Sequence, residues 1–333
     1  MMIPIVLASD EKYIAPTYIT ILSALINKNE GTEYIFYLLC PNSISVDGRQ
    51  ILSSLAHQYE TSINIVNMGN LFDNIEMKID HITVPTYYRL CLPELLVKEK
   101  RCIYLDSDTI VNDDLTELYE IPMEGYFIGG VLSEGIHIDR IYARELCKRI
   151  GLKDVSTYIN AGVLLMNLDE IRKADIVGQW LELTHKRFPA QDQDILNLSC
   201  YGKIKVIELK FNAMTKCNAI KDYNLTYESS VYSEKEIRDA VNSPIIIHFA
   251  DRVKPWNDRK SLWAEYWWGM VDSVKDEFAY RYINCFIDRY EKLSAITKRK
   301  SLKQKFIRIT QVVGVYSTLK SLDDFIHSKG NQR

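Results

Sequence analysis

The first third of the chain alternates short, β-rich apolar segments with longer segments of helical periodicity. The apolar segments lie at Ile3–Ala8, Tyr34–Cys40 and Ser62–Val66. Between them, Pro16–Lys28 and residues 51–56 repeat apolar side chains at helical spacing. Strands joined by helices of this length pair in parallel rather than as hairpins, because parallel neighbours need a crossover. The pattern predicts βαβ units and a mostly parallel sheet with helices on both faces.

Later segments extend this α/β pattern. The apolar segments that we interpret as further strands are Arg101–Leu105, Tyr126–Leu132, Gly162–Met166 and Ile245–His248. After Asp258 the pattern is helical to the end of the chain. We therefore expect one α/β domain over about residues 1–265 and a helical C-terminal region over residues 266–333.

Charge divides the chain into an acidic body and a basic tail. The net charge is -3 over 333 residues, so electrostatics do not favour a nucleic-acid partner. Between Glu291 and Asp323 there is no acidic residue, and eight lysines and arginines lie there. A basic, partly amphipathic segment can bind an anionic membrane surface. It can equally be a solvated helix or dock on the acidic body, so these interpretations stay open.

Cysteine usage indicates a reducing compartment. The seven cysteines are scattered and form no C-x-x-C pair, which argues against a disulfide framework or a zinc ribbon. The N-terminal segment lacks a basic region and reads as a buried strand rather than a signal peptide. We expect a cytoplasmic protein that reaches the inner face of the membrane, if at all, through its basic tail.

The motif Asp106-Ser107-Asp108 directly follows the apolar segment Arg101–Leu105. In open α/β sheets, ligands bind beyond the carboxyl ends of the strands, so the motif lies where a site is expected. Two carboxylates one residue apart can approach one divalent cation, whose other positions are filled by phosphate oxygens. An acidic triplet can also simply cap a strand or the next helix.

A strand that ends in this motif also fits phosphatases of the haloacid dehalogenase type. There the first aspartate is the nucleophile and the second is the general acid, and a distal acidic pair must follow another apolar strand. Asp113-Asp114 lies too close along the chain, and Asp323-Asp324 follows no strand. Phosphatase chemistry at Asp106 and Asp108 is therefore the weaker alternative.

Further segments, in a specific order and spacing, favour another chemistry. They are Ala8-Ser9-Asp10, His81-Ile82-Thr83, Thr86–Leu90, Tyr104–Val111, Asn160–Asn167, Gln191–Asn197 and His248–Trp256. On these segments the chain, from about Ile3 to Trp256, resembles family 8 glycosyltransferases, the group that contains bacterial lipopolysaccharide galactosyl- and glucosyltransferases and glycogenin. The resemblance implies a GT-A-like fold that binds a nucleotide at the carboxyl edge of its sheet.

The resemblance also implies an activity. We expect a retaining hexosyltransferase that moves galactose or glucose from a UDP-sugar to a carbohydrate or glycolipid acceptor, in the synthesis of lipopolysaccharide or another cell-surface glycan. By resemblance the metal ligands are Asp106, Asp108 and His248. Imidazole with two carboxylates suits Mn²⁺ better than Mg²⁺, which stays the alternative cation. Without the resemblance, His248 would rather be interpreted as a satisfied core histidine or one at the end of a buried strand.

The resemblance assigns the remaining site residues as well. Those expected to bind the donor are Ala8, Asp10, His81, Arg89, Asp106, Ser107, Asn160, Ala161 and Lys254. The two expected at the reacting carbon are Asp192, which accepts hydrogen bonds from sugar hydroxyls, and Gln193, nearest the anomeric carbon. Each residue also has an interpretation without a functional role. These are a turn aspartate at Asp10, a surface ion pair at Arg89, a loop lysine at Lys254, and helix caps at Asp192 and Gln193.

Two positions depart from the family pattern. Asp251 stands where relatives commonly have glycine, and its carboxylate would repel phosphate unless it points outward or pairs with Arg252. Ser133, followed by Glu134, stands where relatives often carry an acid that contacts the sugar. A non-catalytic nucleotide- or glycan-binding protein with the same fold therefore stays a third hypothesis.

Overall fold

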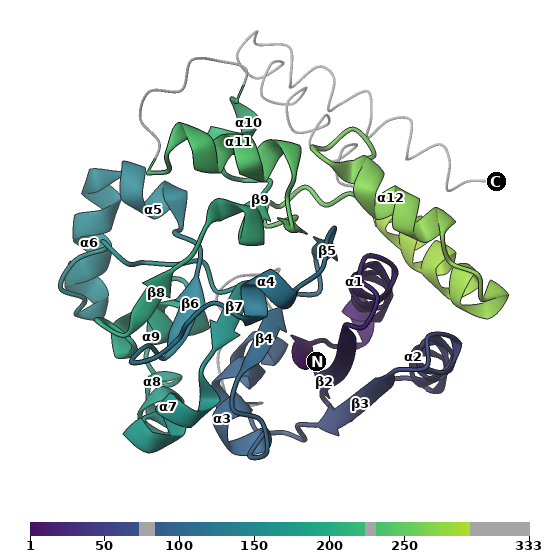
Figure 1. Ribbon diagram of the computed structural model, residues 1–333, viewed down its shortest axis with the longest axis horizontal. Coiled ribbons are helices and arrows are strands. Elements are labelled where there is room, and N and C mark those ends of the chain that lie inside the picture. Colours follow the sequence, from purple (N-terminus) through teal and green to yellow (C-terminus); the bar gives the residue numbers. More distant parts are fainter. Residues whose placement is uncertain (73–83, 224–230, 294–333) are drawn as a thin grey trace, which may run out of the picture. The chain divides into compact units, whose positions relative to one another are not determined.

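A seven-stranded sheet lies at the centre of the computed structural model, which describes residues 1–72, 84–223 and 231–293 (Figure 1). Its strands, in spatial order, are β3 (Ser62–Asn67), β2 (Glu33–Cys40), β1 (Met2–Ala8), β4 (Cys102–Leu105), β7 (Val163–Met166), β6 (Ile128–Gly130) and β8 (Ile204–Val206). Only β7 runs antiparallel to its neighbours. All other pairs are parallel, which confirms the predicted mostly parallel sheet.

Helices connect the strands and cover both faces of this sheet. They are η1 (Glu11–Tyr13), α1 (Ile14–Ile26), α2 (Val46–Gln58), η2 (Val84–Cys91), α3 (Leu92–Leu95), α4 (Thr116–Tyr119), α5 (Glu134–Ile138), α6 (Arg140–Ile150), α7 (Leu168–Ala174), α8 (Val177–Leu183), α9 (Asp192–Ser199), η3 (Leu209–Asn212), α10 (Asn218–Lys221), α11 (Glu234–Asn242) and α12 (Ala264–Asp272). Successive residues of β1 point to opposite faces, and Ile5, Val6 and Leu7 have no exposed surface. A strand buried on both faces needs helices on both sides, as the sequence predicts.

A second, three-stranded sheet carries part of the site. Its order is β5 (Thr109–Val111), β10 (Ile246–His248) and β9 (Ala213–Met214). The turn Asp106-Ser107-Asp108 takes the chain from β4 in the large sheet directly to β5 in the small one. The strand expected at Ile245–His248 therefore belongs to the small sheet. Strands β5, β8 and β9 were not predicted from the sequence; they have only two or three residues and do not lie in the apolar segments that were interpreted as strands.

Buried hydroxyl groups of α1 hold the other edge of β5. Thr20 Oγ1 donates to the carbonyl oxygens of Thr109 and Ser107, at 2.8 and 3.1 Å. Ser23 Oγ accepts from the backbone N–H of Val111 at 2.9 Å. Residues three apart lie on the same face of a helix, so α1 can satisfy the backbone of β5 where no strand pairs with it. This contact fixes the strand that follows the acidic turn.

The C-terminal region divides from the rest of the chain. Met1–Ile283 form one compact unit and Asn284–Arg333 a second. Residues 284–293 of the second unit are helical, and the basic tail expected to contact a membrane lies almost wholly outside the described residues. The domain boundary expected near residue 265 stays a prediction. Within the described ranges, no helix combines the length and apolarity that crossing a bilayer requires.

Replacing Thr20 by valine tests the anchoring of β5. Valine keeps the shape of the side chain but leaves buried carbonyl groups without their donor, which costs about 1–3 kcal/mol. We expect a loss of that size in the free energy of unfolding, measured by urea denaturation. Ser199→Ala is the matched control, because its buried hydroxyl has no hydrogen-bond partner among the described residues. An equal effect of both substitutions would contradict the anchoring role.

Candidate active site

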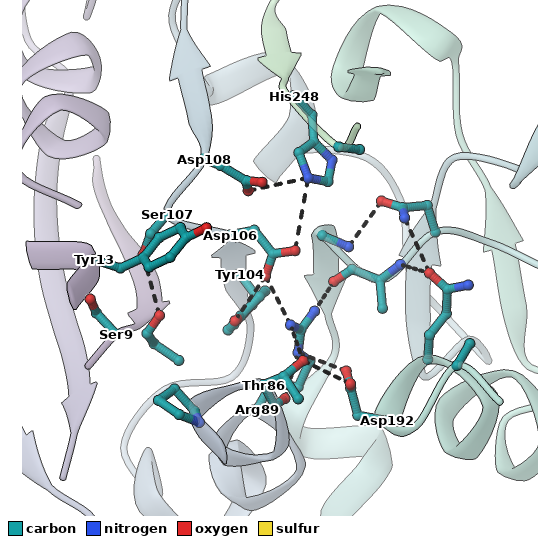
Figure 2. Close-up of a pocket in the computed structure, with 18 of the residues that line it drawn as sticks. Ser9, Tyr13, Thr86, Arg89, Tyr104, Asp106, Ser107, Asp108, Asp192 and His248 are labelled. Carbon is teal, nitrogen blue, oxygen red and sulfur yellow. Dashed lines mark hydrogen bonds and ion pairs between the residues drawn. The ribbon is translucent and has the colours of Figure 1, made fainter. Parts of the chain in front are cut away.

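A cavity of about 450 Å³ opens at the carboxyl edge of the large sheet (Figure 2). Every predicted site residue that the structure describes lines it: Ala8, Asp10, Arg89, Asp106, Ser107, Asp108, Asn160, Ala161, Asp192, Gln193, His248 and Lys254. His81 lies outside the described residues. Segments as far apart in the sequence as Ala8 and Lys254 thus meet at one cavity, and the binding role of each side chain stays a prediction.

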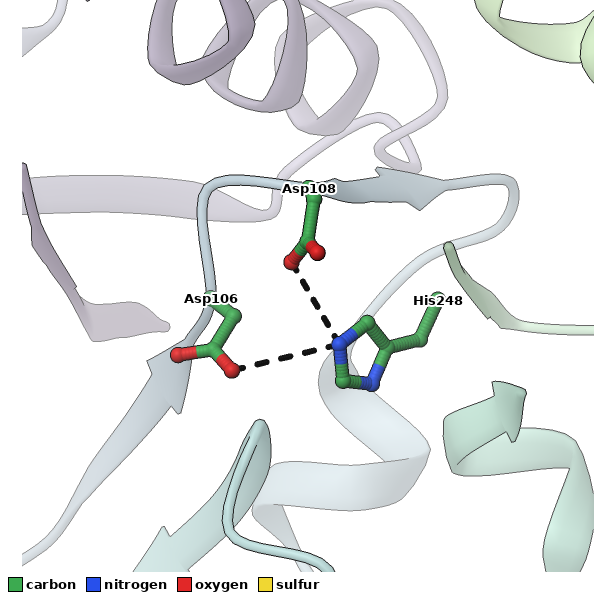
Figure 3. A group of neighbouring side chains, drawn as sticks. All are labelled: Asp106, Asp108 and His248. Carbon is green, nitrogen blue, oxygen red and sulfur yellow. Dashed lines mark ion pairs between the residues drawn. The ribbon is translucent and has the colours of Figure 1, made fainter. Parts of the chain in front are cut away.

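Asp106, Asp108 and His248 form a cluster in this cavity that can hold a metal ion (Figure 3). Their ligand atoms all lie within 4.8 Å of one another. His248 Nε2 is 3.3 Å from Asp108 Oδ1 and 3.9 Å from Asp106 Oδ2. The pairing of β10 with β5 produces this approach, because it sets His248 opposite Thr109, the residue after Asp108.

The donor set fits a divalent cation. Two carboxylates and one imidazole nitrogen suit Mn²⁺, and the other ring nitrogen, Nδ1, lies 2.9 Å from Asn212 Oδ1, which leaves Nε2 facing the carboxylates. Gly162 gives these side chains their room. A Cβ added there would clash with the His248 ring and lie 2.7 Å from Asp106 Oδ2.

Lys254 balances the charge of Asp108. Its Nζ lies 2.5 Å from Asp108 Oδ2 and 2.5 Å from the carbonyl oxygen of Phe249. Burial raises the pKa of Asp108, but the charge of Lys254 and the neighbouring His248 outweigh it and hold that pKa well below its usual range. Asp108 is therefore ionised at neutral pH and available as a cation ligand.

Arg89 holds two of the cavity's carboxylates. Its guanidinium pairs with Asp106 Oδ1 at 2.8 Å and with Asp192 Oδ2 at 3.0 Å. It also lies over the ring of Tyr104, 4.1 Å from the centroid, and donates to the carbonyl oxygen of Ala161. Only 3% of the side chain is exposed. Arg89 is thus a buried ion-pair residue rather than a surface one, and its contact with the donor stays a prediction.

Asp192 and Gln193 begin α9 on the far side of the cavity. Gln191 precedes them with a φ of 53° and a ψ of -121°, a conformation unusual for a residue with a side chain. The Asp192 carboxylate accepts a hydrogen bond from Thr86 Oγ1 at 2.7 Å. The N-cap residue of α9 is Gln191, without a capping side-chain hydrogen bond, so neither Asp192 nor Gln193 is the cap that the sequence offered as an alternative. Burial raises the pKa of Asp192 to about 6, although Arg89 acts to lower it.

The structure answers one alternative interpretation, at Asp10, and one departure from the family pattern, at Asp251. Asp10 accepts a hydrogen bond from the backbone N–H of Lys12 at 3.0 Å, so it caps η1 while lining the cavity. Asp251 pairs with Lys221 at 2.9 Å instead of with the side chain of Arg252. This ion pair partly neutralises the carboxylate that departs from the family pattern.

Other residues in or directly behind the cavity were not among the predicted site residues. They are Tyr13, Tyr104, Tyr142, Gly162, Lys216 and, behind His248, Asn212. Gly162 lies inside the segment Asn160–Asn167, so its small size was a usable signal. Tyr104 begins the segment Tyr104–Val111, whereas the other four lie in segments whose periodicity or composition gives no sign of a site. They meet the cavity only because of the fold.

Comparisons with known proteins agree with the geometry. The model of the family described as "Glycosyl transferase family 8" matches residues 4–260. Glycosyltransferase GlyF of Streptococcus pneumoniae is 30% identical over 282 residues, which cover 83% of this chain and 63% of that protein. The lipopolysaccharide 1,2-glucosyltransferase of Escherichia coli is 26% identical over 268 residues, or 77% of this chain and 73% of that protein.

A solved structure of the galactosyltransferase LgtC, in complex with donor and acceptor sugar analogs, has the same fold. It superposes with a TM-score of 0.69 at 26% identity and covers 82% of this chain and 97% of that chain. A second structure of LgtC carries a glutamine-to-glutamate substitution in its active site. The similarity confirms the expected GT-A-like fold.

Gly162→Ala tests whether the cluster needs its close packing. The added Cβ would push His248 and Asp106 apart, so we expect Mn²⁺ to bind at least 10-fold more weakly in isothermal titration calorimetry. Gly178→Ala on α8 is the matched control, since nothing lies within 4 Å of a Cβ there. It should leave Mn²⁺ affinity unchanged. Unaltered Mn²⁺ binding by Gly162→Ala would show that the cation is held elsewhere.

Proposed function

The chain belongs to glycosyl transferase family 8, and we propose that it is a divalent-cation-dependent, retaining hexosyltransferase that uses a UDP-sugar. Galactose or glucose is the proposed sugar, since LgtC is a galactosyltransferase and the E. coli relative is a glucosyltransferase. A carbohydrate acceptor, in lipopolysaccharide or another surface glycan, follows from the same relatives. The observation that carries the proposal is the cluster of Asp106, Asp108 and His248 beside Lys254 in the cavity.

One side of the cavity binds the diphosphate of the donor, and the other side binds its sugar. A cation bound by the cluster would supply positive charge to the diphosphate of the donor. Lys254, next to Asp108, adds a second charge that stabilises the departing UDP. Across the cavity, Asp192 accepts hydrogen bonds from the sugar hydroxyls and Gln193 lies nearest the anomeric carbon. These contacts orient the sugar for transfer.

The partners of the cavity's carboxylates favour attack on the same face of the sugar. Four aspartates line the cavity among the described residues: Asp10, Asp106, Asp108 and Asp192. The first caps η1, the next two belong to the cluster, and Asp192 is paired with Arg89. No carboxylate is left as an obvious covalent nucleophile. The acceptor hydroxyl therefore attacks the anomeric carbon while the bond to phosphate breaks, and its proton passes to the leaving phosphate oxygen.

The phosphatase alternative has no support. The family that matches is a glycosyltransferase family, and Asp106 is held by Arg89 at 2.8 Å and by the Tyr104 hydroxyl at 3.1 Å. A carboxylate held in this way is a ligand or an ion-pair partner rather than a free nucleophile. Hydrolysis of p-nitrophenyl phosphate at rates typical of phosphatases would reverse this conclusion.

The basic C-terminal tail adds a location to the proposal. We propose that the enzyme works in the cytoplasm and reaches an anionic membrane surface through the lysines and arginines after Glu291. Each basic residue near such a surface contributes about 1 kcal/mol of binding. Removing residues 292–333 should then abolish binding to anionic liposomes, measured by co-sedimentation. Unchanged binding would remove the tail from the proposal.

Thermal stability against a panel of nucleotide sugars tests the function itself. A ligand that binds only the folded state raises the melting temperature, so we expect a UDP-hexose to do so and Mn²⁺ to enlarge the shift. Asp108→Asn should remove the Mn²⁺-dependent part and the turnover of the UDP-hexose. Asp113→Asn, at an exposed aspartate outside the cavity, is the control. Binding without turnover in the wild type would favour the non-catalytic hypothesis.

The pKa of Asp192 predicts an acid limit of activity. Below a pKa of about 6 the carboxyl group is protonated and loses its charge as a hydrogen-bond acceptor, so kcat/KM should fall as the pH drops through 6. Asp192→Asn should remove this limb and lower kcat/KM by roughly 10- to 100-fold, the cost of one hydrogen bond to a charged group. An acid limb that persists in the variant would belong to another residue.

A further inference from the structure

A continuous chain of hydrogen bonds joins the metal-site histidine to the helix that carries Gln193. It runs through His248, Asn212, Asn160, Gln193, Tyr158 and Asp194. Its five links measure 2.9, 2.9, 3.1, 3.2 and 2.6 Å in that order. All of these side chains are buried except that of Gln193, which is partly exposed to the cavity. The chain therefore runs inside the protein from one side of the cavity to the other.

Two backbone N–H groups fix the direction of this chain. The N–H of Ala161 donates to the Gln193 side chain at 3.1 Å, and the N–H of Gly162 donates to the Asn160 side chain at 3.0 Å. A backbone N–H can only donate, so each of these amides must present its oxygen there. The nitrogen of Asn160 then donates to Gln193, and the nitrogen of Gln193 donates to Tyr158.

The same logic reaches the imidazole ring. The oxygen of Asn160 faces Asn212, so Asn212 must present its nitrogen to Asn160 and its own oxygen to His248. Nδ1 of His248 must then carry a proton. That leaves Nε2, the atom that faces Asp106 and Asp108, to offer its lone pair to a cation.

We propose that Asn212 is a positioning residue that selects the Nδ1–H tautomer of His248 for the cation and, through Asn160, orients the carboxamide of Gln193. Asn212 does not line the cavity, and it lies outside the segments that resemble the family. It has no exposed surface. It contacts His248 on the side of the ring away from the two aspartates, and it contacts Gln193 only through Asn160. The proposal rests on the proposed function to the extent that a cation binds the cluster.

Two substitutions separate the two halves of this role. Asn212→Leu removes both hydrogen bonds, so we expect Mn²⁺ affinity to fall 10- to 100-fold, as for other outer-sphere partners of a metal ligand. Asn212→Asp keeps an oxygen for His248 Nδ1 but sets a second oxygen against that of Asn160. It should hold Mn²⁺ at least as tightly as the wild type while kcat falls and KM for the donor changes little.

Asn197→Leu is the matched control. Asn197 is a buried asparagine that makes three hydrogen bonds, two with the backbone of Ile159 and one to the carbonyl oxygen of Gln193. It is not part of the series of hydrogen bonds between His248 and Asp194. It should lower the melting temperature and leave Mn²⁺ affinity unchanged. Calorimetry on the full-length protein with Mn²⁺ alone and no sugar nucleotide gives this measurement without any dependence on turnover.

Nitrogen spectra of the histidines, recorded with diamagnetic Mg²⁺ bound, give a readout that does not depend on turnover. With ¹⁵N-labelled histidine and saturating Mg²⁺, His248 of the wild type should carry a proton on Nδ1 and none on Nε2. Asn212→Leu should show a mixture or the other tautomer, and Asn197→Leu should match the wild type.

The outcomes distinguish this inference from the proposed function. Equal Mn²⁺ affinity in the wild type and Asn212→Leu, or equal losses in Asn212→Leu and Asn197→Leu, would overturn the role of Asn212 and leave the transferase proposal standing. An Nε2–H tautomer in the wild type would overturn it as well. Failure of the wild type to bind Mn²⁺ at all would overturn both proposals.

Discussion

The turn Asp106-Ser107-Asp108 is the constraint on which the site depends. It joins the large sheet to the small one, so both aspartates lie where two sheets meet rather than at the end of a single strand. The small sheet brings His248 to the same point through its pairing with β5. Backbone hydrogen bonds therefore hold all three segments that carry Asp106, Asp108 and His248.

The cavity concentrates negative charge, and the fold compensates it with two buried or partly buried cations. Arg89 lies between Asp106 and Asp192, and Lys254 lies against Asp108. Burying a carboxylate without such partners would cost several kcal/mol. The compensation leaves Asp192 with a raised pKa and Asp108 with a lowered one, so the carboxylates of one cavity differ in their affinity for protons.

Support for the site extends well behind the side chains that line it. Thr20 and Ser23 hold the strand after the acidic turn, Gly162 leaves room for Asp106 and His248, and Asn212 forms a hydrogen bond with Nδ1 of His248. None of these residues needs to touch a substrate. Site geometry of this kind is held by hydrogen-bonded neighbours as much as by the ligands themselves, because a free side chain would lose rotational freedom on binding.

The sequence by itself determined the βαβ pattern, the mostly parallel sheet and the strand that ends in two aspartates, because periodicity and turn composition are local properties. It also indicated His248, Asp192 and Gln193, through segments that resemble a known family. Only the tertiary structure decided that β10 pairs with β5 in a second sheet, that Arg89 is buried between two carboxylates, and that Asn212 lies behind the histidine. These features depend on contacts between residues far apart in the chain, and local periodicity does not tell which strand or side chain will be the partner of another.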